Sequence, residues 1–578
     1  MNFEEPLRAV EKTESDAAGR LTAGGLVAIM AEKGGSAMVE NFEKMGLRPF
    51  GAAPAERHME WYRRRKTAFL HFGPNTFTDR EWGDGRESAE IFAPSELDCR
   101  QWAKVLREGG FDAAILTAKH HDGFCLWPSA YTEHSVKRSP GAPDVVGKFV
   151  AACREFGIKP GLYISPWDRN HPSWGTDKYN DIFVGQLTEL MTLYGEIWEC
   201  WWDGAGSAEA RYDWKRWAEI VRNNQPQCVL FGCLGAAEYV DVRWVGNERG
   251  IAGENCWGTI EPGIIVDEIC AALNSGSPDG SRFIPAETNT SIRPGWFYHA
   301  SQDGQVKQGE TLMDYWFRSA GRNTAILLNL PPDRRGLIHE EDARVVKEWN
   351  DRLEAVFAEN LAAKGRITSG WEPLLKADFD AVRASDTLLP EIRIDFPEEI
   401  VFDCILLREV IELGHRIRGF RAEALTEGGW QLLLEGKCMG FCRGERFPEI
   451  RAKAVRLTVT EAAALPVLRS IGLYRGAAPV TARENAPKEP PIAQTQGWGH
   501  TIEIALEGIY SYDRVEISPA PEGSWQVHSF NGTRYEQTAE AMGESCDFSP
   551  VTGSYRLKLT SDAFSPDTRV KVIYTKGK

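Results

Sequence analysis

One aspartate has a sequence setting that favours nucleophilic catalysis. Asp203 follows an aromatic run and precedes small residues in EIWECWWDGAG. A carboxylate stays ionised at neutral pH, and neighbouring indoles can pack against the apolar face of a sugar ring. The small residues that follow would leave room for that ring. This setting suits a carboxylate that attacks an anomeric carbon, and it suits equally an aspartate that caps a following helix.

Chemistry at an anomeric carbon needs a second carboxyl group as general acid and base. Glu248, in VRWVGNERG, ends an apolar run that follows Asp203 in the chain. Glu254, in IAGENCWG, and Glu287, in IPAETNTS, lie in the same part of the sequence. Spacing favours Glu248 and leaves the other two glutamates open.

Two adjacent histidines, His120 and His121, end another apolar run in KHHDGF. Metal binding is one interpretation, but no His-x3-His or HExxH spacing accompanies them, and the cysteines are not spaced for zinc. A neutral imidazole both donates and accepts hydrogen bonds, so contacts with sugar hydroxyls fit better. A purely structural histidine pair is the alternative.

Short apolar runs alternate with helical periods between residues 60 and 350, and many of the runs end in such polar groups. Alternating strands and helices predict parallel βαβ units, and eight runs predict a (β/α)8 barrel of the TIM type. Barrel active sites lie at the carboxyl ends of the strands, so the polar residues should converge on one mouth. A doubly wound open sheet is the alternative. The runs are TAFLHFG (67–73), AAILTAKHH (113–121), KPGLYISP (159–166), IWECWWDG (197–204), VLFGCLG (229–235), DVRWVGNE (241–248), GWFYH (295–299) and AILLNLPP (325–332).

The pattern changes after the barrel region. Short alternating strands separated by Gly, Pro and acidic turns predict a β-sandwich over 360–478, and the proline-rich stretch ENAPKEPPIAQ (484–494) divides it from further β-type sequence. We therefore expect a peripheral segment at 1–55, a catalytic barrel at 56–355, this sandwich, and a second small sandwich at 490–578.

Composition restricts the partners. The 578 residues carry a net charge of −16, which disfavours nucleic acid and anionic membranes as partners. The N-terminal sequence has no basic region followed by an apolar core, and the 12 cysteines show no repeated CxxC spacing. Free thiols in a reducing compartment are the simplest interpretation, so we expect a cytoplasmic protein.

Seven motifs, in order over about residues 60–340, together resemble glycoside hydrolase family 29, the α-L-fucosidases. A long segment, DRNHPSWGT, and the VRWVGNE arrangement look like the subgroup that prefers α-1,3- and α-1,4-linked fucose on branched glycans. The motifs are FLHFGPNTFTDREWGDG, LTAKHHDGFCLWPS, GLYISPWDRNHPSWGTDKYN, WWDGA, VRWVGNE, SIRPGWFYH and GRNTAILLNLPPDRRGLI.

The resemblance implies a retaining exo-α-L-fucosidase that works by double displacement without a metal or organic cofactor. It implies that Asp203 is the nucleophile and Glu248 the acid/base, with Glu254 as the alternative because the family's other subgroup places its acid on a different loop. The implied substrate is a fucosylated oligosaccharide or glycoconjugate. Residues matching the fucose pocket are His71, Trp82, His120, His121, Tyr163, Trp201, Arg243 and Trp296.

Three other functions remain open at this point. A transfucosylase would use the same residues, and a broad-specificity α-L-fucosidase would share the same barrel. A glycan-binding protein with a relic barrel is the non-enzymatic alternative. The 365–476 segment resembles the galactose-binding-like sandwich of the subgroup, and a scaffold role for it is at least as plausible as glycan binding.

Overall fold

The computed structural model describes most of the chain from residue 42 onward. The described ranges are 42–140, 144–205, 210–232, 234–262, 269–375, 381–478, 495–498, 501–505, 511–518, 521, 523–530, 535–552, 556–561 and 569–575. Most of the predicted peripheral segment and the whole proline-rich linker therefore lie outside the described residues.

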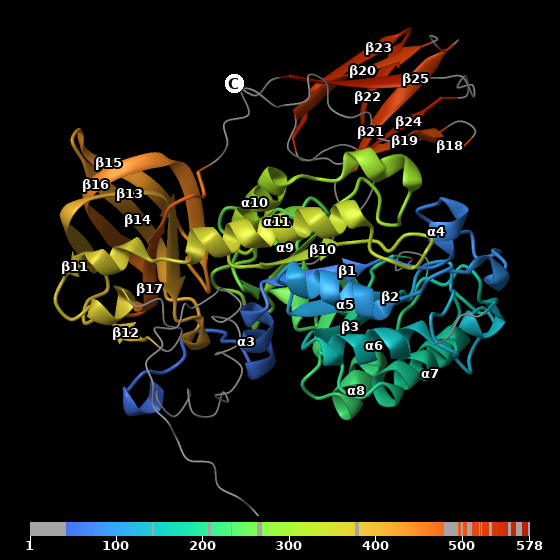
Figure 1. The fold of residues 1–578 in the computed structure, drawn as a ribbon, viewed down its shortest axis with the longest axis horizontal. Helices are drawn as coiled ribbons and strands as arrows, with labels where there is room; N and C mark the ends of the chain where they lie inside the picture. The colour runs from blue at the N-terminus through green and yellow to red at the C-terminus, as the bar shows by residue number, and fades with distance from the viewer. Residues whose placement is uncertain are drawn as a thin grey trace, which may run out of the picture.

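Eight parallel strands close into a barrel, in the order β1-β10-β9-β6-β5-β4-β3-β2 (Figure 1). This confirms the predicted (β/α)8-like barrel and excludes the open sheet. The strands are β1 (Lys66–Leu70), β2 (Ala113–Lys119), β3 (Lys159–Ile164), β4 (Glu199–Trp202), β5 (Val229–Gly232), β6 (Val242–Trp244), β9 (Ala286–Ser291) and β10 (Ala325–Asn329).

Helices surround these strands, and three of them end where the sequence places glycine. Gly110, Gly157 and Gly195 have φ values of 68°, 68° and 69°, the left-handed conformation typical of a helix end. They follow α5, α6 and α7, whose apolar faces pack on the barrel. The helices are α3 (Glu56–Arg63), α4 (Pro74–Thr78), α5 (Cys99–Glu108), α6 (Val145–Glu155), α7 (Asp177–Leu193), α8 (Trp214–Asn224), α9 (Ile269–Ser275), α10 (Gly309–Arg318) and α11 (Glu340–Phe357).

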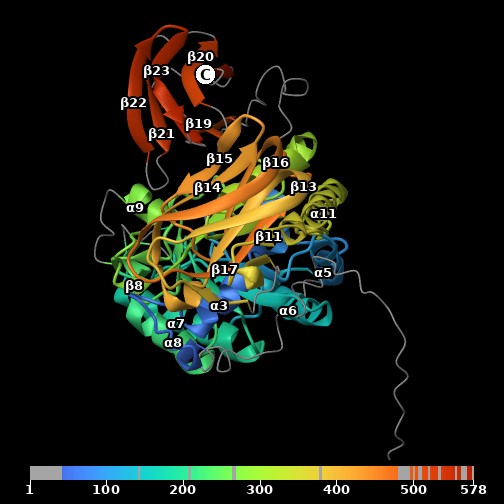
Figure 2. The same cartoon turned by 90° about the vertical axis from the view of Figure 1, so that its left-hand side faces the viewer.

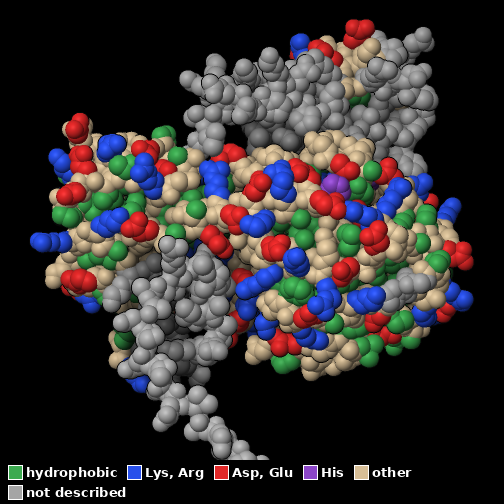
Figure 3. Space-filling view, in the orientation of Figure 1, with side chains coloured by type: hydrophobic (Ala, Val, Ile, Leu, Met, Phe, Trp, Pro, Cys, Tyr) green, Lys and Arg blue, Asp and Glu red, His purple; other side chains and the backbone are tan. Residues whose placement is uncertain are grey.

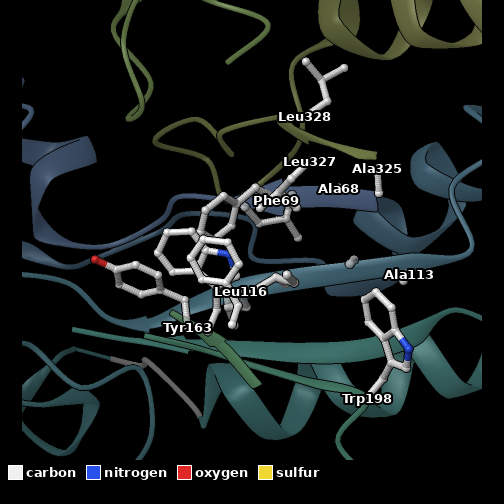
Figure 4. Packing of buried hydrophobic residues seen from close by; sticks show 14 of the residues in the cluster. Ala68, Phe69, Ala113, Leu116, Tyr163, Trp198, Ala325, Leu327 and Leu328 are labelled. Atoms are coloured by element: carbon white, nitrogen blue, oxygen red, sulfur yellow. The ribbon is translucent and has the colours of Figure 1, made fainter. Parts of the chain in front are cut away.

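The barrel interior changes character along its axis (Figure 4). Small residues, Ala113 and Ala325, lie at the amino ends of their strands. Phe69 and Tyr163 lie toward the carboxyl ends, with ring centroids 5.7 Å apart. The interior is therefore packed, and its carboxyl end is built from aromatic rings that can form the floor of a site.

One predicted strand is wrong. GWFYH (295–299) lies in a loop, and the seventh barrel strand is β9, AETNTS, which precedes it. All six β9 side chains are buried, yet five are polar and so carry no apolar signal. Hydrogen bonds satisfy such groups: Asn289 accepts from the Trp244 indole at 3.1 Å, and the Thr288 hydroxyl donates to the Ala325 carbonyl at 2.9 Å.

Antiparallel sheets follow the barrel, as expected for the C-terminal half (Figure 2). The exact domain limits predicted above stay predictions. The first sheet has the order β12-β17-β13-β16-β14-β15, with β11 pairing β13, and comprises β11 (Arg366–Ile367), β12 (Arg383–Ala384), β13 (Glu391–Glu409), β14 (Ile417–Thr426), β15 (Gly429–Gly436), β16 (Arg443–Ala462) and β17 (Val467–Tyr474).

The last part of the chain forms one five-stranded and one three-stranded sheet. Their orders are β18-β19-β24-β21-β22 and β23-β20-β25. The strands are β18 (Thr495–Trp498), β19 (Thr501–Ala505), β20 (Ser511–Ser518), β21 (Ser524–Phe530), β22 (Tyr535–Met542), β23 (Ser545–Thr552), β24 (Arg556–Thr560) and β25 (Arg569–Thr575).

Asn323 connects the barrel to the first of these sheets. This residue precedes β10 and has a left-handed φ of 59°, unusual for a non-glycine residue. Its side chain donates to the Cys256 carbonyl at 2.9 Å and accepts from the Phe441 amide at 2.8 Å. A Cβ atom on Gly440 would lie 2.3 Å from the same side chain, so glycine permits the close approach. The two domains therefore share a buried polar junction.

The surface seen in Figure 3 mixes both signs of charge, with Lys and Arg interspersed among Asp and Glu. Within the described part of the chain, no helix has the length and apolar character needed to cross a membrane.

Candidate active site

Asp203 lies directly after β4, at the carboxyl end of the barrel, and both of its oxygens are held. The Tyr163 hydroxyl donates to Oδ2 at 3.0 Å, and the Ala205 amide donates to Oδ1 at 2.8 Å. The side chain is nevertheless 28% exposed. Helix α8 begins later, at Trp214, and its capping side chain is Asp213, which accepts from the Arg216 amide. Asp203 is thus an oriented, accessible carboxylate and does not cap that helix.

Three buried histidines lie beside this carboxylate. His71 Nδ1 is 2.9 Å from Asn329 Oδ1, and His121 Nδ1 is 2.7 Å from Ser165 Oγ. His120 lies between them, with ring centroids 5.7 Å from His71 and 4.1 Å from His121. His121 Nε2 is 4.0 Å from Asp203 Oδ2.

Burial governs the charge of this histidine group. It lowers the pKa of His71 to about 4 and the pKa values of His120 and His121 below the ordinary value, because desolvation disfavours the imidazolium. The three rings are therefore neutral near pH 7, and each can both donate and accept a hydrogen bond. Such rings could bind sugar hydroxyls, and the hydroxyl-binding role predicted from KHHDGF stays a prediction.

Aromatic rings form the floor and rim of the site. Trp201 stacks on Phe231 at a centroid distance of 3.9 Å and lies 5.2 Å from Tyr163. Trp82 is 49% exposed, and its ring contacts His121 and Trp167 edge-on, at 5.8 Å each. The structure thus brings these predicted pocket residues to one end of the barrel.

The two candidate acids lie in different places. Glu248, four residues after β6, is half-buried, and its Oε2 accepts a hydrogen bond from Trp296 Nε1 at 3.1 Å. The Trp296 ring is 5.0 Å from His71, which places this pair at the mouth. Glu254 has an exposed side chain, and its carbonyl accepts from Arg443 of β16, at the junction with the sheet. The geometry therefore favours Glu248 as the partner of Asp203.

Arg243 is a correction to the predicted pocket. Its guanidinium is buried and donates to the carbonyls of Leu273, Ile284 and Trp257, with Cys256 Sγ 3.8 Å away. Leu273 belongs to α9, and the other three partner residues lie in the segments that precede β9. All four lie on the outer side of β6. Side chains alternate along a strand, and Arg243 points away from the barrel interior. It anchors the β6 region and does not line the pocket.

Glu287, the third candidate acid, lies inside the barrel beneath the pocket floor. Its carboxylate accepts from the indoles of Trp201, at 3.0 Å, and Trp61, at 3.3 Å. Burial raises the pKa of Glu287 to about 7. Glu199 on β4 is also fully buried, and burial together with the nearby Glu287 and Asp241 raises its pKa well above the ordinary value. Glu287 thus supports the floor from below.

This buried pair makes the stability of the barrel depend on pH. The folded-state pKa of Glu287 is raised, so its stabilising contribution is complete below about 4.5 and is lost as the pH rises through about 7. Glu287→Gln mimics the protonated form. We expect the free energy of unfolding of this variant, relative to wild type, to rise by roughly 2–3 kcal/mol between pH 5 and pH 8.

Urea denaturation at the two pH values measures this change. The control is Glu340→Gln, since the hydrogen bond from Arg335 lowers the pKa of Glu340 to about 2 and this group does not titrate over that range. Its difference from wild type should be the same at both pH values. A pH-independent difference for Glu287→Gln would show that Glu287 is ionised throughout.

Residues outside the predicted site hold the loops around it. Lys119 Nζ lies 3.3 Å from Asp168 Oδ2 and donates to the Tyr179 hydroxyl and to Gln186 Oε1, both at 2.8 Å. This buried group ties the loop after β2, with His120 and His121, to the loop after β3. A charged residue inside a buried strand end, as in LTAKHH, is the sequence signal for such an anchor.

Comparisons with known proteins agree with this site. The family model described as Alpha-L-fucosidase matches residues 47–355. A putative alpha-L-fucosidase 1 from Oryza sativa subsp. japonica is 38% identical over 472 residues, covering 77% of this chain and 90% of the relative.

Two solved structures extend the comparison. That of a putative alpha-L-fucosidase from Bacteroides thetaiotaomicron has a TM-score of 0.72 and 42% identity, covering 74% of this chain and 99% of the other. A Ruminococcus gnavus fucosidase of glycoside hydrolase family 29 in complex with fucose has a TM-score of 0.68 and 30% identity, covering 75% and 97%.

Proposed function

Because the chain belongs to the α-L-fucosidase family, glycoside hydrolase family 29, we propose that it removes terminal α-1,3- or α-1,4-linked L-fucose from branched, Lewis-type glycans with retention of configuration. One observation carries the proposal: Asp203, held by Tyr163 and open to solvent, shares the barrel mouth with Glu248. A pair of carboxyl groups is the standard requirement for retaining hydrolysis.

The proposed reaction has two displacements. Asp203 attacks the anomeric carbon, the bond from that carbon to the glycosidic oxygen breaks, and Glu248 gives its proton to the departing oxygen. In the second step Glu248 takes a proton from water, the water oxygen bonds to the anomeric carbon, and Asp203 leaves as a carboxylate. Tyr163 orients the nucleophile by donating to Oδ2, and the neutral histidines are placed to bind the sugar hydroxyls.

A row of tryptophans at the rim is the feature that supports the proposal of a branched leaving group. Trp82 and Trp167 contact edge-on, and Trp174 continues the row at 6.3 Å from Trp167. Indole faces pack against the apolar faces of sugars, so a row of tryptophans that begins at His121, beside the nucleophile, can hold the sugars beyond the fucose. This row lies partly in DRNHPSWGT, the segment that resembles the subgroup specific for branched glycans.

Three substrates test the proposed specificity. Incubation with a Lewis-type trisaccharide, with 2'-fucosyllactose and with an aryl fucoside should release fucose fastest from the trisaccharide. Proton NMR during the reaction should show the α-anomer of fucose first. Release of the β-anomer first would contradict the retaining mechanism, and faster cleavage of 2'-fucosyllactose would contradict the linkage preference.

A rim variant gives a sharper test of the leaving-group row. Trp167→Ala should lower kcat/KM for the trisaccharide about 10-fold relative to that for the aryl fucoside, because about 1.4 kcal/mol of ring packing is lost. The control is Trp430→Ala. Trp430 lies on β15 of the first sheet after the barrel, where Arg393 and Arg456 flank its ring. An unchanged ratio in Trp167→Ala would show that the row does not bind the leaving group.

We also propose that the protein works in a reducing compartment such as the cytoplasm. Ten of the described cysteines carry free thiols, and all ten are buried. A protein of this kind needs no oxidising environment for its stability.

A further inference from the structure

His299 lies between two carboxylates at the edge of the active site. Its Nδ1 is 2.8 Å from Asp79 Oδ1, its Nε2 is 2.7 Å from Glu81 Oε1, and its side chain is 1% exposed. A neutral imidazole donates from one nitrogen alone, so donation to both carboxylates requires the imidazolium. Burial opposes this charge, but Glu81 and Asp79 outweigh it and raise the pKa of His299.

The backbone around this bridge is adapted to it. Asp79 has a left-handed φ of 60°, which turns the chain directly after α4. On the facing loop, a Cβ atom on Gly295 would lie 2.4 Å from Glu81 Oε1 and 3.1 Å from the His299 ring. A side chain at position 295 would therefore push Glu81 away from its place. Both features indicate that the contact between the two loops is tightly fitted.

Glu81 passes this constraint to the catalytic mouth. Its carboxylate accepts from the backbone amides of Trp296, at 2.7 Å, and Phe297, at 3.2 Å. Trp296 then donates through its indole to Glu248 Oε2 at 3.1 Å. A continuous series of contacts thus leads from His299 through Glu81 and Trp296 to the proposed acid/base.

We propose that His299 is a positioning residue whose bridge between Asp79 and Glu81 sets the placement of Trp296 and, through its indole, the direction of the Glu248 carboxyl group. This inference rests on the proposed role of Glu248. Proton transfer to a departing oxygen depends on hydrogen-bond distance and direction, so a small displacement of Glu248 slows the step that needs its proton.

The other side of the same loop is held independently. Arg169 Nη1 donates to the Gly83 carbonyl at 2.6 Å, and Asn170 Nδ2 donates to the Gly85 carbonyl at 2.7 Å. These bonds secure the backbone next to Trp82 without His299. Loss of the bridge should therefore affect the Trp296 side of the loop and leave the rim in place.

Leaving-group dependence tests the proposal. An aryl fucoside with a poor leaving group needs protonation of the departing oxygen, whereas a 2,4-dinitrophenyl fucoside does not. In His299→Gln, kcat/KM for the poor substrate should fall about 10-fold or more relative to that for the activated one, as part of the contribution of a general acid is lost. His339→Gln is the control, since His339 is a neighbouring histidine that stacks on Tyr298. It should leave the ratio unchanged.

Trp296→Phe keeps the inference testable if His299→Gln does not fold. It removes the indole donor but keeps the backbone amide that Glu81 accepts from, and it should change the substrate ratio in the same direction. The double variant should lose less than the two single effects multiplied, because both act on Glu248. Equal losses on both substrates, or no loss, would overturn the inference. A wild-type protein that hydrolyses neither fucoside would instead refute the proposed function.

Discussion

Asp203→Asn should reduce kcat for fucoside hydrolysis by roughly 10⁴-fold or more, the scale of loss when a catalytic nucleophile is removed. The amide cannot form the covalent fucosyl ester, so the reaction stops before its first displacement. The fold should persist, because the amide oxygen can still accept from Tyr163 or from the Ala205 amide, the two groups that hold the aspartate. Steady-state kinetics with an aryl fucoside measures the loss, and thermal unfolding verifies the fold.

A second aspartate provides the control for this experiment. Asp213 caps α8 ten residues further on, through its bond to the Arg216 amide at 3.2 Å. Asp213→Asn retains a capping oxygen and should keep near-wild-type kcat. Wild-type-like turnover by Asp203→Asn would remove Asp203 from the mechanism, however well its position fits.

Glu248→Ala should lose about 10²- to 10⁴-fold in kcat/KM on a substrate with a poor leaving group, the usual contribution of a general acid and base. On an activated fucoside the first displacement proceeds without Glu248. The fucosyl-enzyme then accumulates, because no general base activates the attacking water. Added azide needs no base to attack that intermediate, so it should restore turnover and give fucosyl azide. Product analysis by mass spectrometry identifies the azide adduct.

Glu254→Ala is the matched comparison, because it removes a glutamate whose exposed side chain lies beside the sheet junction. This variant should remain within about 3-fold of wild type, as expected for a surface substitution away from the site. Azide rescue in Glu254→Ala with none in Glu248→Ala would transfer the acid/base role to Glu254.

The architecture of the barrel could be predicted because its signals are local. Apolar runs, many of which end in polar groups, predict β1 to β6 and β10. Strand β9 could not be found in this way. Its buried residues are mostly polar, and their side chains form hydrogen bonds with residues of neighbouring elements, such as Trp201, Trp244 and Ala325. The loop at 295–299 carries the stronger apolar signal, so the sequence predicts the strand there and not at β9.

The site could be predicted in part. Asp203, Glu248 and the histidines stand in short motifs, and the structure brings them to one mouth. Arg243 stands in such a motif too, yet the alternation of side chains along β6 turns it outward. The bridge of His299 to Asp79 joins residues 220 positions apart, and the bond of Trp201 to Glu287 spans 86. Pairings over such distances depend on the closed fold, and no local pattern encodes them.

The junction at Asn323 bears on how such enzymes can be recombined. Its amide spans both domains, from the Cys256 carbonyl in the barrel to the Phe441 amide in the sheet. A shortened enzyme that stopped after α11 would lack Phe441, one hydrogen-bond partner of this amide. It would also expose to water the apolar surface of the barrel that Phe441 and Tyr474 pack against. For domain shuffling or for grafting the barrel onto another module, the useful crossover point therefore lies after the sheet, beyond β17. The barrel and this sheet therefore form one structural unit, joined by the Asn323 junction and by a shared apolar core.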